Sequence, residues 1–127
     1  MTNKIVFDSS AILALLNEEA GKEMVSENLD RAVVSTVNIV EVATVLIRKG
    51  LKSEEIFNLL KETFLHIEDF DLEQSVIAAS FKDVTKNGLA LGDRACLALA
   101  KSKNLPVLTA DKVWKGLELG IKVKLIR

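Results

Sequence analysis

Short apolar runs alternate with longer helical patterns along the whole chain, and this alternation limits the folds open to it. Five runs have strand character, at residues 4–7, 32–35, 65–68, 106–109 and 122–126. Helices are predicted over 9–17, 21–29, 36–49, 53–64, 71–86 and 93–103, with a short one over 112–117. Strands that alternate with helices predict a mainly parallel sheet covered by helices on both faces. The expected fold class is therefore α/β, with a central sheet of four or five strands.

The length and composition fit one globular domain. The chain has 127 residues, of which 49% are hydrophobic, and we expect a single domain over 1–127. No stretch approaches the ~18 apolar residues of a membrane span. The apolar block at 11–16 is not typical of a signal peptide. The single cysteine, Cys96, excludes an internal disulfide framework, so we expect a cytoplasmic protein.

Charge is nearly balanced overall but uneven along the chain. The net charge is −1, so no global attraction toward nucleic acid is expected. Residues 101–127, however, hold seven basic and two acidic side chains. Such a basic end could receive a phosphate backbone, or it could be an ordinary solvated lysine surface.

Four acidic residues occur where a parallel sheet would place its active site. Asp8 follows the first strand-like run, and Asp111 follows the run at 106–109. Asp93 opens a predicted helix, and Glu41 interrupts an otherwise apolar one. Ligands of open parallel sheets bind outside the carboxyl ends of the strands. Acids gathered there repel one another, and a hard divalent cation relieves that repulsion.

Each acid also has a purely structural interpretation. Taken singly, the three aspartates are better explained as helix N-caps. Glu41 falls on one helical face with Asn38, Thr44 and Arg48, which would make a polar stripe. The combination of four acids favours the metal interpretation, with Mg²⁺ or Mn²⁺ activating a water for phosphate chemistry.

Other polar residues have supporting roles at most. Ser9, Ser10 and Thr109 accompany the acids and could hold carboxylates or phosphate oxygens. Arg94 could contact a phosphate or be a surface charge. His66 is the only histidine and lies in a strand-like run, which favours a structural role. The parts of a zinc cluster, a Ser-His-Asp triad or a glycine-rich phosphate loop are missing.

Four sequence blocks together resemble one known family. They are IVFDSSA at 5–11, NIVEV at 38–42, LGDRA at 91–95 and LTAD at 108–111. In this order and spacing they resemble the signature blocks of PIN domains, most closely the toxin ribonucleases of VapBC toxin–antitoxin modules. The resemblance extends from end to end of the chain.

The resemblance implies a PIN-type α/β/α sandwich with endoribonuclease activity. It implies a Mg²⁺ or Mn²⁺ site made by Asp8, Glu41, Asp93 and Asp111, with Ser10 and Thr109 as supporting polar groups. It also implies a homodimer, an RNA substrate, and a small antitoxin that lays a peptide over the site. The RNA target is not implied.

Other functions agree less well with these residues. A receiver-type phosphoacceptor module is also doubly wound with acids at strand ends. That fold needs a second acid next to Asp8, and it leaves Glu41 and Asp93 without roles. A haloacid-dehalogenase-like phosphatase would need an aspartate where Ser10 stands. A PIN-like domain that only binds a partner would not need the full set of acids.

Overall fold

Five parallel strands form one sheet in the computed structural model, which describes residues 3–127. The strand order is β3-β2-β1-β4-β5, so the chain moves outward from β1 first to one edge and then to the other. The strands are β1 (Ile5–Phe7), β2 (Ala32–Ser35), β3 (His66–Glu68), β4 (Val107–Thr109) and β5 (Val123–Leu125). The predicted α/β class with a parallel central sheet is confirmed.

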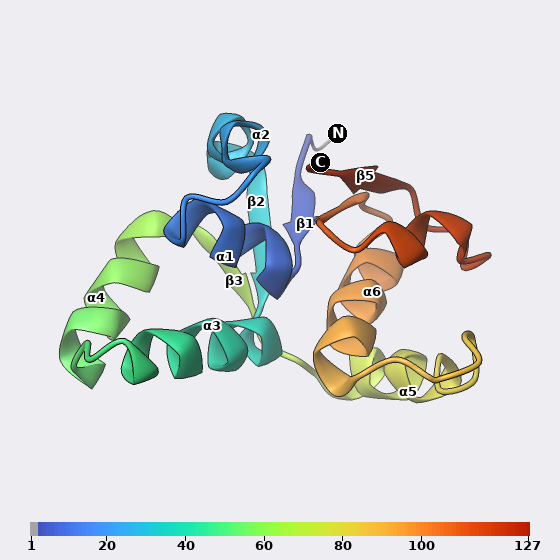
Figure 1. Ribbon diagram of the computed structural model, residues 1–127. Coiled ribbons are helices and arrows are strands. Elements are labelled where there is room, and N and C mark those ends of the chain that lie inside the picture. The colour runs from blue at the N-terminus through green and yellow to red at the C-terminus, as the bar shows by residue number, and fades with distance from the viewer. Residues whose placement is uncertain (1–2) are drawn as a thin grey trace.

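Helices cover both faces of this sheet (Figure 1). On one face lie α1 (Ser9–Leu16), α2 (Lys22–Glu27), α3 (Thr36–Arg48) and α4 (Ser53–Thr63). On the other lie α5 (Leu72–Ser80), α6 (Leu91–Lys103) and the 3₁₀ helix η2 (Lys112–Gly116). A second 3₁₀ turn, η1 (Leu29–Arg31), leads into β2. The result is the three-layer sandwich that the alternating pattern predicts.

The two faces of β1 show how the pattern produces the layers. Side chains of a strand point alternately to opposite faces of the sheet. Ile5 and Phe7 accordingly pack into the core under α1 to α4, and Val6 packs into the core under α6. All three are fully buried, as expected of a central strand covered on both faces.

The helix predicted over 71–86 is wrong in its second half, because α5 ends at Ser80. Beyond it, the N–H groups of Phe81 and Lys82 bond to carbonyls three residues back, which tightens the chain into turns. Phe81 is buried in the core against α6, and this packing fixes where the helix ends. Gly88, with φ +72°, closes the last of these turns.

Two other predicted elements also differ in kind or start. Helix α6 begins at Leu91 rather than Asp93, so Asp93 is its third residue and Ala90 its N-cap. The segment predicted as a short helix over 112–117 is a 3₁₀ helix. Helix α4 begins at Ser53 as predicted, with Lys52 at its N-cap. The last strand is an edge of the sheet, as its alternating charges predict. None of the helices within residues 3–127 is long and apolar enough to span a membrane.

Candidate active site

Asp8 lies at the carboxyl end of β1 and is the N-cap of α1. Its side chain accepts hydrogen bonds from the Ala11 N–H at 2.9 Å and from the Ser10 hydroxyl at 2.7 Å. The Thr109 hydroxyl donates to its other oxygen at 2.6 Å. Only 4% of Asp8 is exposed, and this burial raises the pKa of its carboxyl even though the three donors act to lower it. The capping and the active-site interpretations of Asp8 therefore describe the same geometry.

Thr109 connects Asp8 to Asp111 across neighbouring strands. The register of β1 with β4 pairs Phe7 with Leu108, so the residues that follow them lie side by side. The Thr109 hydroxyl donates to Asp8 and accepts from the Asp111 N–H at 3.0 Å. Asp111 in turn caps η2 by accepting from the Val113 N–H at 3.0 Å. The two aspartates are thus fixed at one edge of the sheet.

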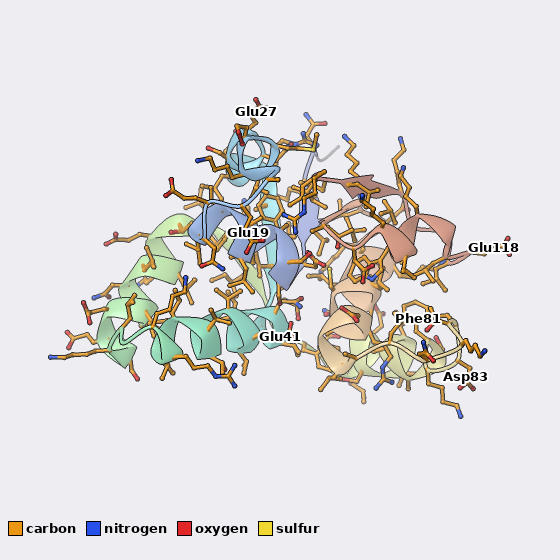
Figure 2. All side chains as sticks on the ribbon, in the orientation of Figure 1. Glu19, Glu27, Glu41, Phe81, Asp83 and Glu118 are labelled. Atoms are coloured by element: carbon orange, nitrogen blue, oxygen red, sulfur yellow. The ribbon has the colours of Figure 1, made fainter. Side chains whose placement is uncertain are left out.

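Glu41 reaches the same region from α3. Figure 2 shows its side chain between α3 and the first turn of α6. Its Oε1 accepts from the Ser9 hydroxyl and, at 3.0 Å, from the Asn38 amide. The backbone of Gly92 lies against the carboxylate, since a Cβ on Gly92 would come within 2.2 Å of Oε2. Although the helix places Glu41 on its exposed side, contacts from α1, α3 and α6 hold the carboxylate.

Asp93 completes the set from the first turn of α6. Burial, and after it the charges of Asp8, Asp111 and Glu41, raise the pKa of its carboxyl to about 6. A hydrogen bond from the Ala90 backbone acts in the opposite direction and lowers the pKa of Asp93. Four segments far apart in the sequence therefore bring the four predicted acids into one electrostatic cluster.

The donor set suits a hard cation that keeps some of its water. Among residues 3–127, no three histidine, cysteine, aspartate or glutamate side chains stand close enough to hold a metal ion directly between them. Mg²⁺ commonly binds through one or two carboxylates and several waters, and the four acids offer oxygen ligands of the kind it prefers. Carboxylates that resist ionisation because of one another are stabilised when a cation arrives.

Arg94, His66 and Cys96 are the remaining candidates. The Arg94 guanidinium donates to the Ala78 carbonyl at 3.5 Å, so it is directed along α5. His66 is in β3 and pairs with Val33, as its structural interpretation predicts. Cys96 is fully buried, and desolvation raises the pKa of its thiol well above the ordinary value. A thiol of that kind is inert packing.

Sequence reasoning missed the importance of Asn38 and Gly92. Asn38 was grouped with a polar stripe, but it is buried and contacts α1 and α6 as well as Glu41. Glycine is a poor helix former, so a glycine in the first turn of a helix indicates that another group lies close to the backbone there. Gly92 was the residue in the sequence that carried this information.

Known proteins are similar to this chain over nearly its whole length. The model of the PIN domain family matches residues 5–118. A VapC ribonuclease of Mycobacterium bovis is 29% identical, over 82% of this chain and 88% of that protein. A toxin–antitoxin complex from Klebsiella pneumoniae has a chain of the same fold, with a TM-score of 0.78 at 19% identity and 98% of each chain covered. DNA-bound VapBC from Salmonella typhimurium gives a TM-score of 0.74 at 17% identity and full coverage of both chains.

Proposed function

The chain belongs to the PIN domain family, and from this premise we propose that it is a divalent-metal-dependent endoribonuclease. The observation that carries the proposal is the convergence of the acids: the Thr109 hydroxyl joins Asp8 to the Asp111 N–H, and the Glu41 carboxylate lies against Gly92, the residue before Asp93. The charges of Asp8, Glu41 and Asp111 accordingly raise the pKa of the Asp93 carboxyl. The match over 5–118 supports this function over the receiver-type alternative, and relatives that bear the name VapC ribonuclease support cleavage of RNA. We assign the activity to residues 1–127 acting as one domain in the cytoplasm.

In this proposal Asp8, Glu41, Asp93 and Asp111 hold Mg²⁺ or Mn²⁺, partly through water. A bound ion of this kind makes its water a better nucleophile and offsets the negative charge of the scissile phosphate. Ser10 and Thr109 keep the Asp8 carboxylate oriented, because both hydroxyls donate to it. Ligands held in this way would keep a bound ion in one position relative to the substrate.

Contacts between three basic side chains and the RNA backbone are part of the same proposal. Lys112 and Lys115 are exposed on η2, directly after Asp111, where a phosphate backbone would approach the acids. A phosphate contact by Arg94 stays a prediction, and it requires the guanidinium to turn away from the Ala78 carbonyl.

We also propose that the protein is the toxin of a type II toxin–antitoxin pair. An apolar groove of about 690 Å³ lies between α3, α4 and β3. Phe57 is 65% exposed on its wall, and Ile47 and Leu65 are exposed as well. An apolar groove of this volume suits the apolar face of a helical antitoxin segment. The neighbour from Klebsiella is a toxin–antitoxin complex, and the neighbour from Salmonella is a DNA-bound VapBC.

The third partner in the proposal is a second copy of the chain. Leu72 and Val76 lie one helical turn apart on α5 and are 81% and 65% exposed. Leu91, at the start of the adjacent α6, is exposed too. Apolar side chains gathered on neighbouring helices are typical of an interface between subunits.

Incubation of the purified protein with a mixed RNA pool tests the activity. Wild type with Mn²⁺ should produce discrete fragments, and wild type with EDTA should not. Asp93→Asn should be inactive with either addition while keeping its fold. Cleavage that persists in EDTA or in Asp93→Asn would refute the proposed site. A stable aspartyl-phosphate after incubation with a small phosphodonor would refute the proposed reaction.

A further inference from the structure

Asn38 lies at the meeting point of three helices. It is one turn before Glu41 on α3 and is 1% exposed. Its Nδ2 is 3.0 Å from Glu41 Oε1, 3.1 Å from Ser9 Oγ and 3.2 Å from the Gly92 carbonyl oxygen. One amide group thus contacts α1, α3 and the first turn of α6.

The orientation of this amide follows from its partners. A carboxylate and a carbonyl accept hydrogen bonds and cannot donate them, so the nitrogen of Asn38 must face Glu41 and Gly92. The two N–H groups of Asn38 serve three acceptors, so Ser9 Oγ shares one of them, and the Ser9 hydroxyl donates its own proton to Glu41. Glu41, Asn38 and Ser9 form a closed triangle of hydrogen bonds.

The arrangement is not one that stability alone would favour. Asn38 Oδ1 is buried and has no hydrogen-bond partner. A buried polar atom without a partner destabilises the fold, so an apolar residue would serve packing better here. The Glu41 side chain, in contrast, is on the exposed side of α3 and would sample several rotamers without these contacts.

Gly92 closes the opposite side of the Glu41 carboxylate. A Cβ at this position would lie 2.2–2.4 Å from three carboxylate atoms of Glu41. Because those atoms belong to the end of a flexible side chain, alanine would displace the carboxylate rather than break the backbone packing. Gly92 therefore provides the space that Asn38 and Ser9 direct Glu41 into.

We propose that Asn38 and Gly92 are positioning residues that hold the Glu41 carboxylate against the first turn of α6, beside Asp93. The inference rests on the proposed function in one respect, namely that Glu41 serves a bound divalent ion. Asn38 acts through hydrogen bonds and Gly92 through the absence of a side chain. Two unrelated substitutions should therefore produce the same loss.

Mn²⁺ affinity, measured by electron paramagnetic resonance of the free ion, tests the proposal in a double-mutant cycle. The proteins are wild type, Asn38→Ala, Gly92→Ala, Glu41→Ala and the two double variants with Glu41→Ala. Asn58→Ala on the exposed side of α4 controls for the helix propensity of the asparagine change. Gly116→Ala controls for the glycine change, because a Cβ there would meet nothing within 4 Å. Unfolding in urea, monitored by fluorescence of the single buried tryptophan, Trp114, accompanies each measurement.

We expect Asn38→Ala and Gly92→Ala each to weaken Mn²⁺ binding by about 10- to 100-fold, the usual effect of losing an outer-shell partner. In the Glu41→Ala background, each should change the affinity less than about 2-fold, because the group it positions is gone. Both control variants should bind like wild type.

Several results would overturn the proposal. Equal Mn²⁺ affinities of Asn38→Ala and Asn58→Ala would do so. A double variant whose loss of Mn²⁺ affinity is the sum of the losses in its two single variants would do so as well. Equal Mn²⁺ binding by wild type and Glu41→Ala would also overturn it. If wild type binds no Mn²⁺, the proposed function fails. The urea midpoints then decide the positioning role separately: coupled shifts of Asn38→Ala and Glu41→Ala support it, and additive shifts overturn it.

Discussion

Asp8 and Asp93 are carboxylates held by uncharged donors. The groups that lower the pKa of Asp8 are two hydroxyls and one backbone N–H, and for Asp93 the compensation is a backbone N–H alone. In both cases burial dominates and raises the pKa, and neighbouring acids add to it. The native protein without metal therefore carries negative charges that its own structure opposes.

This opposition predicts that Asp93→Asn stabilises the metal-free protein at pH 7. The pKa of Asp93 is raised from 3.8 to about 6 in the folded state, so the folded state binds a proton more tightly than the unfolded state. Wild type then loses stability relative to the variant as the pH rises from about 4 to above 6, and the two converge below that window. After allowance for solvent screening, we expect a difference on the order of 1–2 kcal/mol at pH 7.

Urea unfolding of both proteins with EDTA, at several pH values between 4 and 8, measures this difference. Asp69→Asn serves as a control, because that residue has no part in the acid cluster. A variant less stable than wild type at pH 7, or a difference independent of pH, would contradict the argument.

At the scale of elements, the same residue type caps helices for different purposes. Asp8 and Asp71 are both N-caps, and each accepts from an N–H at 2.9 Å. Asp71 is exposed, whereas Asp8 is buried with a raised pKa. Asp71 has no reciprocal capping box with Gln74, because the Gln74 amide donates to the Asp69 carbonyl instead.

We therefore predict opposite effects of substitutions at the two caps. Asp71→Ala removes the cap of α5 and should destabilise the protein by about 1 kcal/mol. Asp8→Asn keeps a capping oxygen and removes a buried charge, so metal-free stability at pH 7 should be equal to or above that of wild type. Thermal melts followed by circular dichroism give both values. Asp71→Asn should behave like wild type, and a large loss in Asp8→Asn would show that its charge supports the fold.

The boundaries explain how far the sequence determines these elements. Strand and helix positions were predictable because their apolar periodicity reflects burial on one or two faces of the sheet. The end of α5 was not, because it depends on Phe81 packing against α6, a contact between segments distant in sequence. The acids at strand ends were predictable from topology. The role of Gly92 required knowing that α3 brings Glu41 to α6.

At the scale of the whole molecule, divalent ions should raise stability if the acids share an ion. A ligand that binds only the folded state at 100 times its dissociation constant stabilises it by about 2.7 kcal/mol. The unfolding temperature should therefore keep rising as the Mn²⁺ or Mg²⁺ concentration increases, until the ion also binds the unfolded chain. Asp93→Asn should show a smaller shift, and no shift of wild type at millimolar metal would contradict a shared site.

The exposed apolar face of α5 should determine how many copies of the chain associate. If Leu72 and Val76 are covered by a second copy, the protein should have a mass in solution near twice its 13.9 kDa. Replacing both residues with lysine places charges in the interface and should reduce the mass to that of one chain, because burying unpaired charges is costly. Helix propensity changes little, so the monomer should remain folded.

Light scattering coupled to size exclusion measures the mass, and circular dichroism checks the fold. Met24→Lys, an exposed apolar residue on α2, is the matched control and should leave the mass unchanged. A wild type that elutes as one chain at high micromolar concentration would refute the interface. If the two lysines leave the dimer intact, the interface lies on another face of the protein. The groove between α3 and α4 exposes a second apolar surface that could form it. Because that groove is also the proposed antitoxin site, such a dimer and an antitoxin would compete for it.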